Sequence, residues 1–373
     1  MHKPVSAAVF EGSMPQSRVE EMVIQVRHAA LLDNLEKMNR AACFDRIFLS
    51  TNRPELVEPA SRLGAKVLLN NIDPGDFHFG NELQELVRSH GLSRVFCLNG
   101  AGCPLITEDE LVMIAQELRS RQRFVYANNT QSADMVGFTV PENFYDINLP
   151  AVDNSLALTL RDCFNLTMDL MPHTRGLLFD IDTPTDLVVL GTGPFAGPRM
   201  RAALNELDLN YEKLAKAKAV LGNEYEEVAL IGRIGAPIMA QLNARLKLRL
   251  RVFSEERGMK TLGRIDNKEV VSLLGLLLED AGTERFFGYL ARVARCAFID
   301  SRVLMYHFKY DFSNRERFLS DLGRWREIDN PWLKTFTRAA EECAIPVVLG
   351  GHSLISGSLW AICDEIEEGA AVD

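Results

Sequence analysis

The stretch FDIDTPTDL, residues 179–187, joins a short apolar run to three carboxylates and a Thr-Pro pair. The apolar run favours a buried strand that ends at Asp182, and Thr183-Pro184 is typical of a helix start. Parallel sheets bind ligands at the carboxyl ends of their strands. Asp180 and Asp182 are therefore candidate ligands for a hard cation such as Mg²⁺. A second interpretation is that Asp182 only caps the following helix, because Asp is a favoured N-cap residue.

Composition restricts the class of protein. The chain has 373 residues, of which 47% are hydrophobic and 25% charged, as expected for a soluble globular protein with two domains. Its net charge of -10 argues against a nucleic-acid-binding surface. We see neither a signal-peptide pattern nor an apolar run long enough for a membrane span, so we expect a cytoplasmic protein without a membrane partner. Seven scattered cysteines, none in a C-x-x-C pair, predict buried reduced thiols.

Strand-like apolar runs alternate with amphipathic helical stretches over the first 190 residues. Examples of strands are VSAAVFEG (5–12), DRIFLSTN (45–52) and SRVFCLNG (93–100), and the series ends with GLLFDID (176–182). We expect a helix over 155–170 before that last strand and a long helix over about 199–221 after it. This alternation predicts an α/β fold with a mostly parallel, Rossmann-like sheet and helices on both faces. We expect a first domain over 1–190, a Gly/Pro-rich linker over 191–198 and a second Rossmann-like α/β domain over 199–373.

Two motifs resemble those of nucleotidyltransferases similar to molybdenum-cofactor guanylyltransferase and phospholactate guanylyltransferase. DIDTPTDL (180–187) is similar to the closing motif of these families, and LNGAGCPLITEDEL (98–111) is similar to their G-D-x-P-L strand end and the helix that follows. The resemblance covers about residues 5–190. It implies transfer of a nucleotidyl group from a nucleoside triphosphate, with Mg²⁺ bound at Asp182 and the flanking Asp180. The family's other metal aspartate falls on Gly102, so retention of catalysis stays open.

The resemblance also implies a phosphate-binding loop after the first strand. The loop here reads VFEGSMPQSRVEEM (9–22), in which Gly12, Ser13 and Arg18 stand in for the family's Gly-rich, basic pattern. We expect Gly12 and Ser13 to bind the nucleotide and Arg18 to assist catalysis. Glu11 and two further glutamates add negative charge there, and a plain loop leading into a helix is the alternative.

Two more groups are candidates for the nucleotide site. Asn99 ends the strand before Gly102 and offers a neutral oxygen, and Gly80 lies in the loop DPGDFHFGNELQ (73–84). Phe77 and Phe79 of that loop would stack on a base or, alternatively, anchor the loop in the core.

The second half has no motif that we recognise, but polar residues follow several of its predicted strands. If these strands are parallel neighbours, the side chains converge at one sheet edge and would suit an anionic ligand. The alternative is that each makes only a local cap or ion pair. The residues are Arg257, Asp300, Arg302, His352 and Ser353.

Two functions follow from these patterns. The first is a Mg²⁺-dependent nucleotidyltransferase with a phosphorylated or cofactor-like acceptor. The second is a catalytically degenerate protein that binds a nucleotide, nucleotide sugar or phosphometabolite. The sequence leaves the base, the acceptor and the oligomeric state open, although Trp325 and Trp332 would suit a subunit contact.

Overall fold

Two parallel-rich sheets form the frame of the chain. The computed structural model describes residues 3–70, 72, 75–99 and 102–370. Its strands are β1 Ser6–Glu11, β2 Arg46–Thr51, β3 Lys66–Leu69, β4 Arg94–Asn99, β5 Phe124–Ala127, β6 Met135–Thr139, β7 Thr167–Leu170, β8 Glu227–Gly232, β9 Arg249–Ser254, β10 Cys296–Asp300 and β11 Val347–Gly350. The expected α/β class is confirmed.

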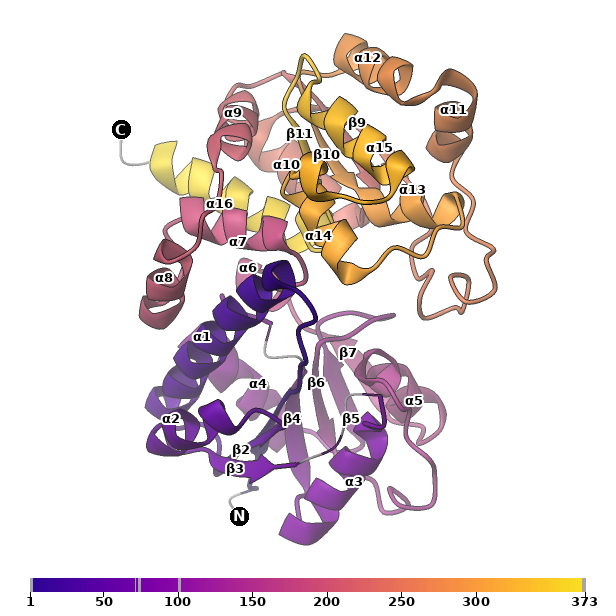
Figure 1. The fold of residues 1–373 in the computed structure, drawn as a ribbon. Helices are drawn as coiled ribbons and strands as arrows, with labels where there is room; N and C mark the ends of the chain where they lie inside the picture. Colours follow the sequence, from indigo (N-terminus) through magenta and orange to yellow (C-terminus); the bar gives the residue numbers. More distant parts are fainter. Residues whose placement is uncertain (1–2, 71, 73–74, 100–101, 371–373) are drawn as a thin grey trace. The chain divides into compact units, whose positions relative to one another are not determined.

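Helices separate most of these strands (Figure 1). The α-helices are α1 Arg18–Ala41, α2 Val57–Arg62, α3 Phe79–His90, α4 Glu108–Ser120, α5 Leu156–Asp162, α6 Arg175–Leu178, α7 Pro184–Thr192, α8 Pro198–Asn205, α9 Glu212–Leu221, α10 Ala236–Leu246, α11 Leu273–Ala281, α12 Thr283–Val293, α13 Ser301–His307, α14 Asn314–Asp321, α15 Pro331–Glu341 and α16 Leu359–Ala370. Short 3₁₀ turns occupy η1 Pro54–Leu56, η2 Asp153–Ser155 and η3 Trp325–Glu327, and a π-helical turn, η4, spans Leu354–Ser358. No helix among the described residues is long and apolar enough to cross a membrane.

The chain divides into two compact units, each built around one sheet. Unit 1 comprises Met1–Met14, Arg27–Leu177 and Gly197–Met200, and unit 2 comprises Pro15–Val26, Leu178–Ala196 and Arg201–Asp373. The residues of the expected linker, 191–198, span the end of α7 and the start of α8.

Unit 1 contains a seven-stranded sheet in the order β3-β2-β1-β4-β6-β5-β7, in which β6 runs antiparallel to β4 and β5. Alternate strand residues face two separate cores. Val9 of β1 packs in the core that α1, α2 and α4 complete, whereas its neighbours Ala8 and Phe10 pack with α3 and α5. Helices therefore cover both faces, as expected, and only the strand ends are left for a ligand.

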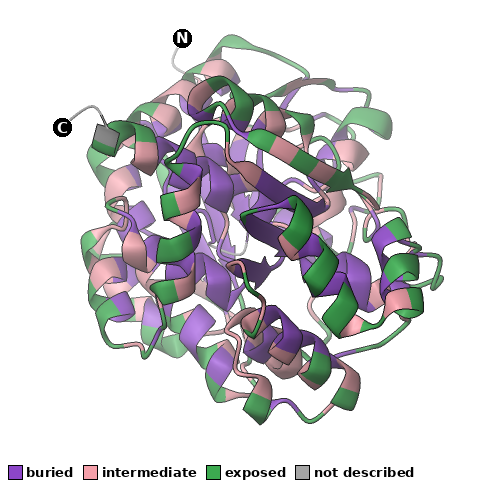
Figure 2. Cartoon of the chain, turned by 90° about the horizontal axis from the view of Figure 1, so that it is seen from above, coloured by how far each residue is buried: buried purple, intermediate pink, exposed green. Residues whose placement is uncertain are grey.

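Unit 2 contains a parallel four-stranded sheet in the order β11-β10-β8-β9. Ala229 and Ile231 of β8 face a core shared with α11, α12 and α15. Helix α9 contacts β10 and β11, and helix α10 contacts β9. Helix α16 packs on both of these helices. Figure 2 shows that buried residues gather on the strands and on the inward faces of the helices.

Three predicted elements are wrong. GLLFDID (176–182) is no strand, because residues 175–178 form helix α6 and residues 179–183 have no regular structure. The helix expected over 155–170 is the short helix α5 followed by strand β7, and the long helix expected over 199–221 is split into α8 and α9. In each case the apolar residues are buried by tertiary packing. Their sequence pattern is the same as that of the expected element, so periodicity alone does not distinguish the two structures.

Candidate functional site

A cavity of about 290 Å³ opens in unit 1 at the carboxyl ends of β1 and β2. This edge is where parallel sheets bind ligands, and the volume is close to the lower end of the range for ligand pockets, about 300–1,000 Å³. Its described lining residues are Phe10, Glu11, Gly12, Ser50, Thr51, Asn52, Asn70, Ile72, Phe77, Phe79, Ala151, Val152 and Asp153.

Glu11 ends strand β1, and its carboxylate is fully buried. Arg27 donates a hydrogen bond from Nη2 to Glu11 Oε2 at 2.8 Å, and His28 Nε2 lies 3.7 Å from Glu11 Oε1. Burial alone would raise the pKa of Glu11, but the charge and hydrogen bond of Arg27 and the proximity of His28 outweigh it and leave that pKa below its ordinary value. Glu11 therefore provides a fixed negative charge in the cavity wall.

Several polar atoms around the end of β1 are buried without a hydrogen-bond partner among the described residues. They are Glu11 Oε1, Ser13 Oγ, His28 Nε2 and both side-chain atoms of Asn99. Asn99 is 4% exposed and pairs in register with Phe10 of β1. Because buried polar groups in proteins are nearly always hydrogen-bonded, this concentration indicates a place where a ligand or water completes the bonds.

Gly12 and Ser13, two expected nucleotide-binding residues, lie at this strand end. Gly12 lines the cavity, and the Ser13 N–H donates to Asn52 Oδ1 at 3.3 Å. Arg53 donates to the Ser13 carbonyl at 3.3 Å and pairs with Glu55 at 2.6 Å. The loop after β1 is thus tied to the residues that follow β2.

Amides and carboxylates make up the polar part of the cavity wall. Asn52 and Asn70 contribute amides, and Asn70 Nδ2 donates to Ser50 Oγ at 3.4 Å. Glu11 and Asp153 are its ionisable residues, and the described lining contains neither lysine nor arginine. An anionic phosphate chain would therefore be repelled inside the cavity, whereas a neutral ring with hydrogen-bonding edges would be accepted.

The aromatic residues of the 73–84 loop face both the cavity and the core, and their stacking on a base stays a prediction. Phe77 and Phe79 line the cavity, and Phe79 also packs edge-on against Phe10 in the core, with ring centroids 5.0 Å apart. Gly80 is a packing residue: a methyl group there would lie 2.5 Å from Leu149 Cβ. Residues 73 and 74 of this loop lie outside the described part of the chain.

The FDIDTPTDL stretch belongs to unit 2, where Thr183 caps helix α7 and Asp186 completes the capping box. Thr183 is the N-cap of α7, and Asp186 accepts from the backbone N–H groups of Asp182 and Thr183 at 3.1 and 2.8 Å. Ser353 and Ser358 also donate to Asp186, at 2.7 and 2.8 Å. The interpretation of Asp182 as the helix cap is wrong.

Asp182 is exposed, and no described residue forms a hydrogen bond or ion pair with its carboxylate. Asp180 is half-buried, and Arg18 is an exposed residue at the start of α1 in unit 2. The described residues contain no group of three or more His, Cys, Asp or Glu side chains that would hold a metal ion. These residues do not form a magnesium site by themselves, and Mg²⁺ at Asp180 and Asp182 stays a prediction.

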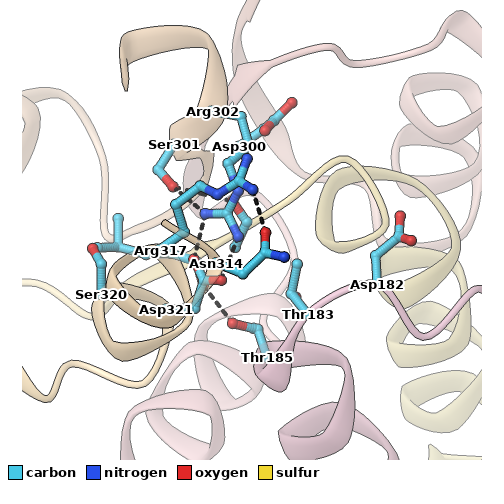
Figure 3. A network of polar contacts seen from close by, with 12 residues as sticks. Asp182, Thr183, Thr185, Asp300, Ser301, Arg302, Asn314, Arg317, Ser320 and Asp321 are labelled. Atoms are coloured by element: carbon cyan, nitrogen blue, oxygen red, sulfur yellow. Dashed lines mark hydrogen bonds and ion pairs between the residues drawn. The ribbon is translucent and has the colours of Figure 1, made fainter. Parts of the chain in front are cut away.

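Of the second-half candidates, Arg302 and Ser353 have structural partners. Arg302 forms two hydrogen bonds to the buried Asp321, at 2.7 and 2.6 Å, and Ser353 donates to Asp186. Figure 3 shows Arg302 in this network with Ser301 and Asp321, while no dashed line reaches Asp182. Asp300 pairs instead with Arg233, and Arg257 and His352 lie near the same strand ends.

Two contributors were not predicted as site residues. His28 lies in the middle of α1, and its sequence neighbours do not distinguish it from a surface residue of an amphipathic helix. Arg233 follows β8 directly, and its position between two glycines was the available signal.

No family model and no curated protein matches the sequence. Among solved structures, a cytidylyltransferase from Leptospira borgpetersenii is similar, at 14% identity and a TM-score of 0.40, over 55% of this chain and 93% of that one. A nucleotidyl transferase from Methanothermobacter matches with 16% identity and a TM-score of 0.38, over 55% of this chain and all of that one. A CMP:2-keto-3-deoxy-manno-octonic acid synthetase in complex with CTP matches with 13% identity and a TM-score of 0.36, with the same coverage. Similarities this weak leave the chemistry of this chain to be argued from its own residues.

Proposed function

We propose that unit 1 binds the nucleoside part of a nucleotide or nucleotide sugar in the cavity at the ends of β1 and β2. The observation that carries this proposal is the composition of the cavity wall. Phenylalanine rings and the amides of Asn52 and Asn70 line the same cavity. A ring stacks on a base of any kind, and an amide offers both a donor and an acceptor to the base edge.

The carboxylates suit the remaining polar groups of a nucleoside. Glu11 Oε1 is buried and lacks a hydrogen-bond partner among the described residues, so it would accept a bond from a ribose hydroxyl. Because the described lining has no cation, we assign the phosphate groups to the cavity mouth, where Arg53 contacts the Ser13 carbonyl.

The test is a thermal-shift screen of the full chain with the four ribonucleoside triphosphates, each with and without Mg²⁺. A ligand that binds the folded state raises the melting temperature by mass action. We then expect Phe77→Ala or Asn70→Ala to weaken binding of the best ligand about tenfold, from the loss of one stacking or hydrogen-bonding contact. Asn81→Ala, an exposed residue of α3 that does not line the cavity, is the matched control. Absence of stabilisation by any nucleotide would refute the proposal, as would equal binding by Phe77→Ala and wild type.

Nucleotidyl transfer is the second candidate function, and the exposed carboxylate of Asp182 favours it. In that reaction an acceptor oxygen attacks the α-phosphorus of the triphosphate, the bond to the β-phosphate oxygen breaks, and pyrophosphate leaves. A pyrophosphate-release assay with Mg²⁺ tests it. We expect Asp182→Asn to abolish release while Asp266→Asn, another exposed carboxylate of unit 2, leaves it intact. Binding without pyrophosphate release would leave the first proposal standing and exclude the second.

A further inference from the structure

Unit 2 has its own strand-end region, which nucleotide binding in unit 1 does not use. Strand β8 pairs with β9 on one side and with β10 on the other, so the chain reverses its direction across the sheet between β8 and β10. Ligands of open parallel sheets bind outside the carboxyl ends of the strands at such a switch point.

The turn from β8 to α10 is built tightly at this point. Gly232 has φ +120°, and a methyl group there would lie 2.5 Å from Asp300 Cβ, so only glycine fits. The turn ends at Gly235, the N-cap of α10, which supplies no side-chain hydrogen bond. Because the first N–H groups of a helix have no intrahelical acceptor, the 11-residue helix α10 presents donors at this edge.

Charged side chains from three strand ends surround the turn. Arg233 donates from Nε and Nη2 to the two oxygens of the fully buried Asp300, at 2.5 and 3.1 Å. Arg257 follows β9, is exposed and forms no ion pair with another described residue. Its guanidinium would lie 3.7 Å from a methyl group at Gly235, next to the start of α10.

His352 adds an imidazole from the end of β11. Burial is the main cause that lowers the pKa of His352 to about 4; the positive charges of Arg233 and Arg257 act in the same direction, and the charges of Asp300 and Asp182 oppose them. All four charged groups therefore act on one imidazole, which is neutral near physiological pH. Arg302 and Ser353 stay outside this set, because Asp321 and Asp186 already bind them.

We propose that Arg233, Arg257, His352 and the start of α10 form a second ligand site, which takes the phosphate group of a small phosphate monoester. The guanidinium of Arg257, which no described carboxylate pairs with, and the helix donors bind the phosphate oxygens, and the neutral imidazole donates one more hydrogen bond. Asp300 holds Arg233 in place beside the turn. Asp182, the other negative group that acts on His352, repels a phosphate and faces the hydroxyl-bearing part of the ester instead.

The experiment uses the full chain with isotope-labelled histidine and inorganic phosphate as the probe. The imidazole signals of His352 are assigned by their loss in His352→Gln. We expect them to shift saturably as phosphate is added near neutral pH at constant ionic strength, and Arg257→Gln to weaken this binding about tenfold or more. Arg251→Gln, which removes another exposed arginine from β9, should leave the affinity unchanged.

Each outcome decides the proposal. It is overturned if phosphate leaves the His352 signals in place, or if it shifts them equally in Arg257→Gln and wild type. Because Arg257 is exposed, its replacement is not expected to unfold the chain, and tryptophan fluorescence verifies this. The result is independent of nucleotide binding in unit 1, since the signal comes from a histidine of unit 2.

Discussion

Asp186 gives the sharpest prediction for the stability of unit 2. Its carboxylate is fully buried, and burial raises the pKa of Asp186 from 3.8 to about 6. Since the folded-state pKa is raised, the stabilising contribution is complete below about pH 3.8 and is lost as the pH rises through about 6. A pKa change of this size corresponds to about 3 kcal/mol, at roughly 1.4 kcal/mol for each pH unit.

Asp186→Asn removes the charge and keeps the acceptor for the backbone N–H groups of Asp182 and Thr183. Its amide group would face Ser358, whose hydroxyl accepts as readily as it donates. We expect the free energy of unfolding of this variant to resemble that of wild type near pH 4. Near pH 7 the variant should exceed wild type by about 3 kcal/mol, because wild type then carries a buried charge.

The assay is urea unfolding followed by tryptophan fluorescence at several pH values. All three tryptophans, Trp325, Trp332 and Trp360, lie in unit 2, so the signal reports that unit. Asp186→Ala is the comparison variant. It leaves the backbone N–H groups of Asp182 and Thr183 without their acceptor and should be less stable than wild type at every pH.

One result would refute this reasoning. Five groups donate to Asp186: two backbone N–H groups and the hydroxyls of Thr183, Ser353 and Ser358. If they outweighed burial, Asp186→Asn would lose stability relative to wild type as the pH rises. A difference that is independent of pH would equally exclude Asp186 as the titrating group.

Three further predictions concern other residues. The pKa of His352 is lowered from 6.5 to about 4, so its contribution is present above pH 6.5 and lost as the pH falls through about 4. Wild type should therefore lose up to about 3 kcal/mol relative to His352→Gln over that range, in the tryptophan assay, and a constant difference would contradict this. Arg233→Met should destabilise unit 2 by about 3–5 kcal/mol because it leaves the buried Asp300 unpaired, and a second change, Asp300→Leu, should restore most of the loss in the same assay. Gly80→Ala should destabilise the chain by about 1–3 kcal/mol through its clash with Leu149, measured by calorimetric melting, whereas Gly75→Ala, which meets no atom within 4 Å, should melt like wild type.

The opposite signs of the Asp186 and His352 effects have a consequence for wild type. Between about pH 4 and pH 6 one group lowers stability as the pH rises and the other increases it by a similar amount. The wild-type curve is thus expected to be nearly flat with respect to these two groups. Asp186→Asn and His352→Gln each remove one titrating group. The free energy of unfolding of each variant should therefore show the pH dependence of the remaining group.

The sequence by itself determined the features that are encoded within a few neighbouring residues. Alternation of apolar runs and helical periods identified β1, β2, β4 and the α/β class, because strand and helix periods differ along the chain. The Thr107–Glu110 capping box is likewise a local pattern, a Thr followed three residues later by a Glu at the start of α4. The general geometry of parallel sheets was the basis for expecting the polar strand ends of unit 2 at one sheet edge.

Only the tertiary structure decided which distant groups meet. Phe179 and Ile181 are buried in a segment packed on the π-helical turn at Gly357, so an apolar run that reads as a strand pairs with no strand. Asp186 receives hydrogen bonds from two serines more than 160 residues away, a pairing that no local pattern encodes. The physical reason is range: caps and periodicity act over one or two turns of chain, whereas burial and side-chain pairing depend on elements that only folding brings together.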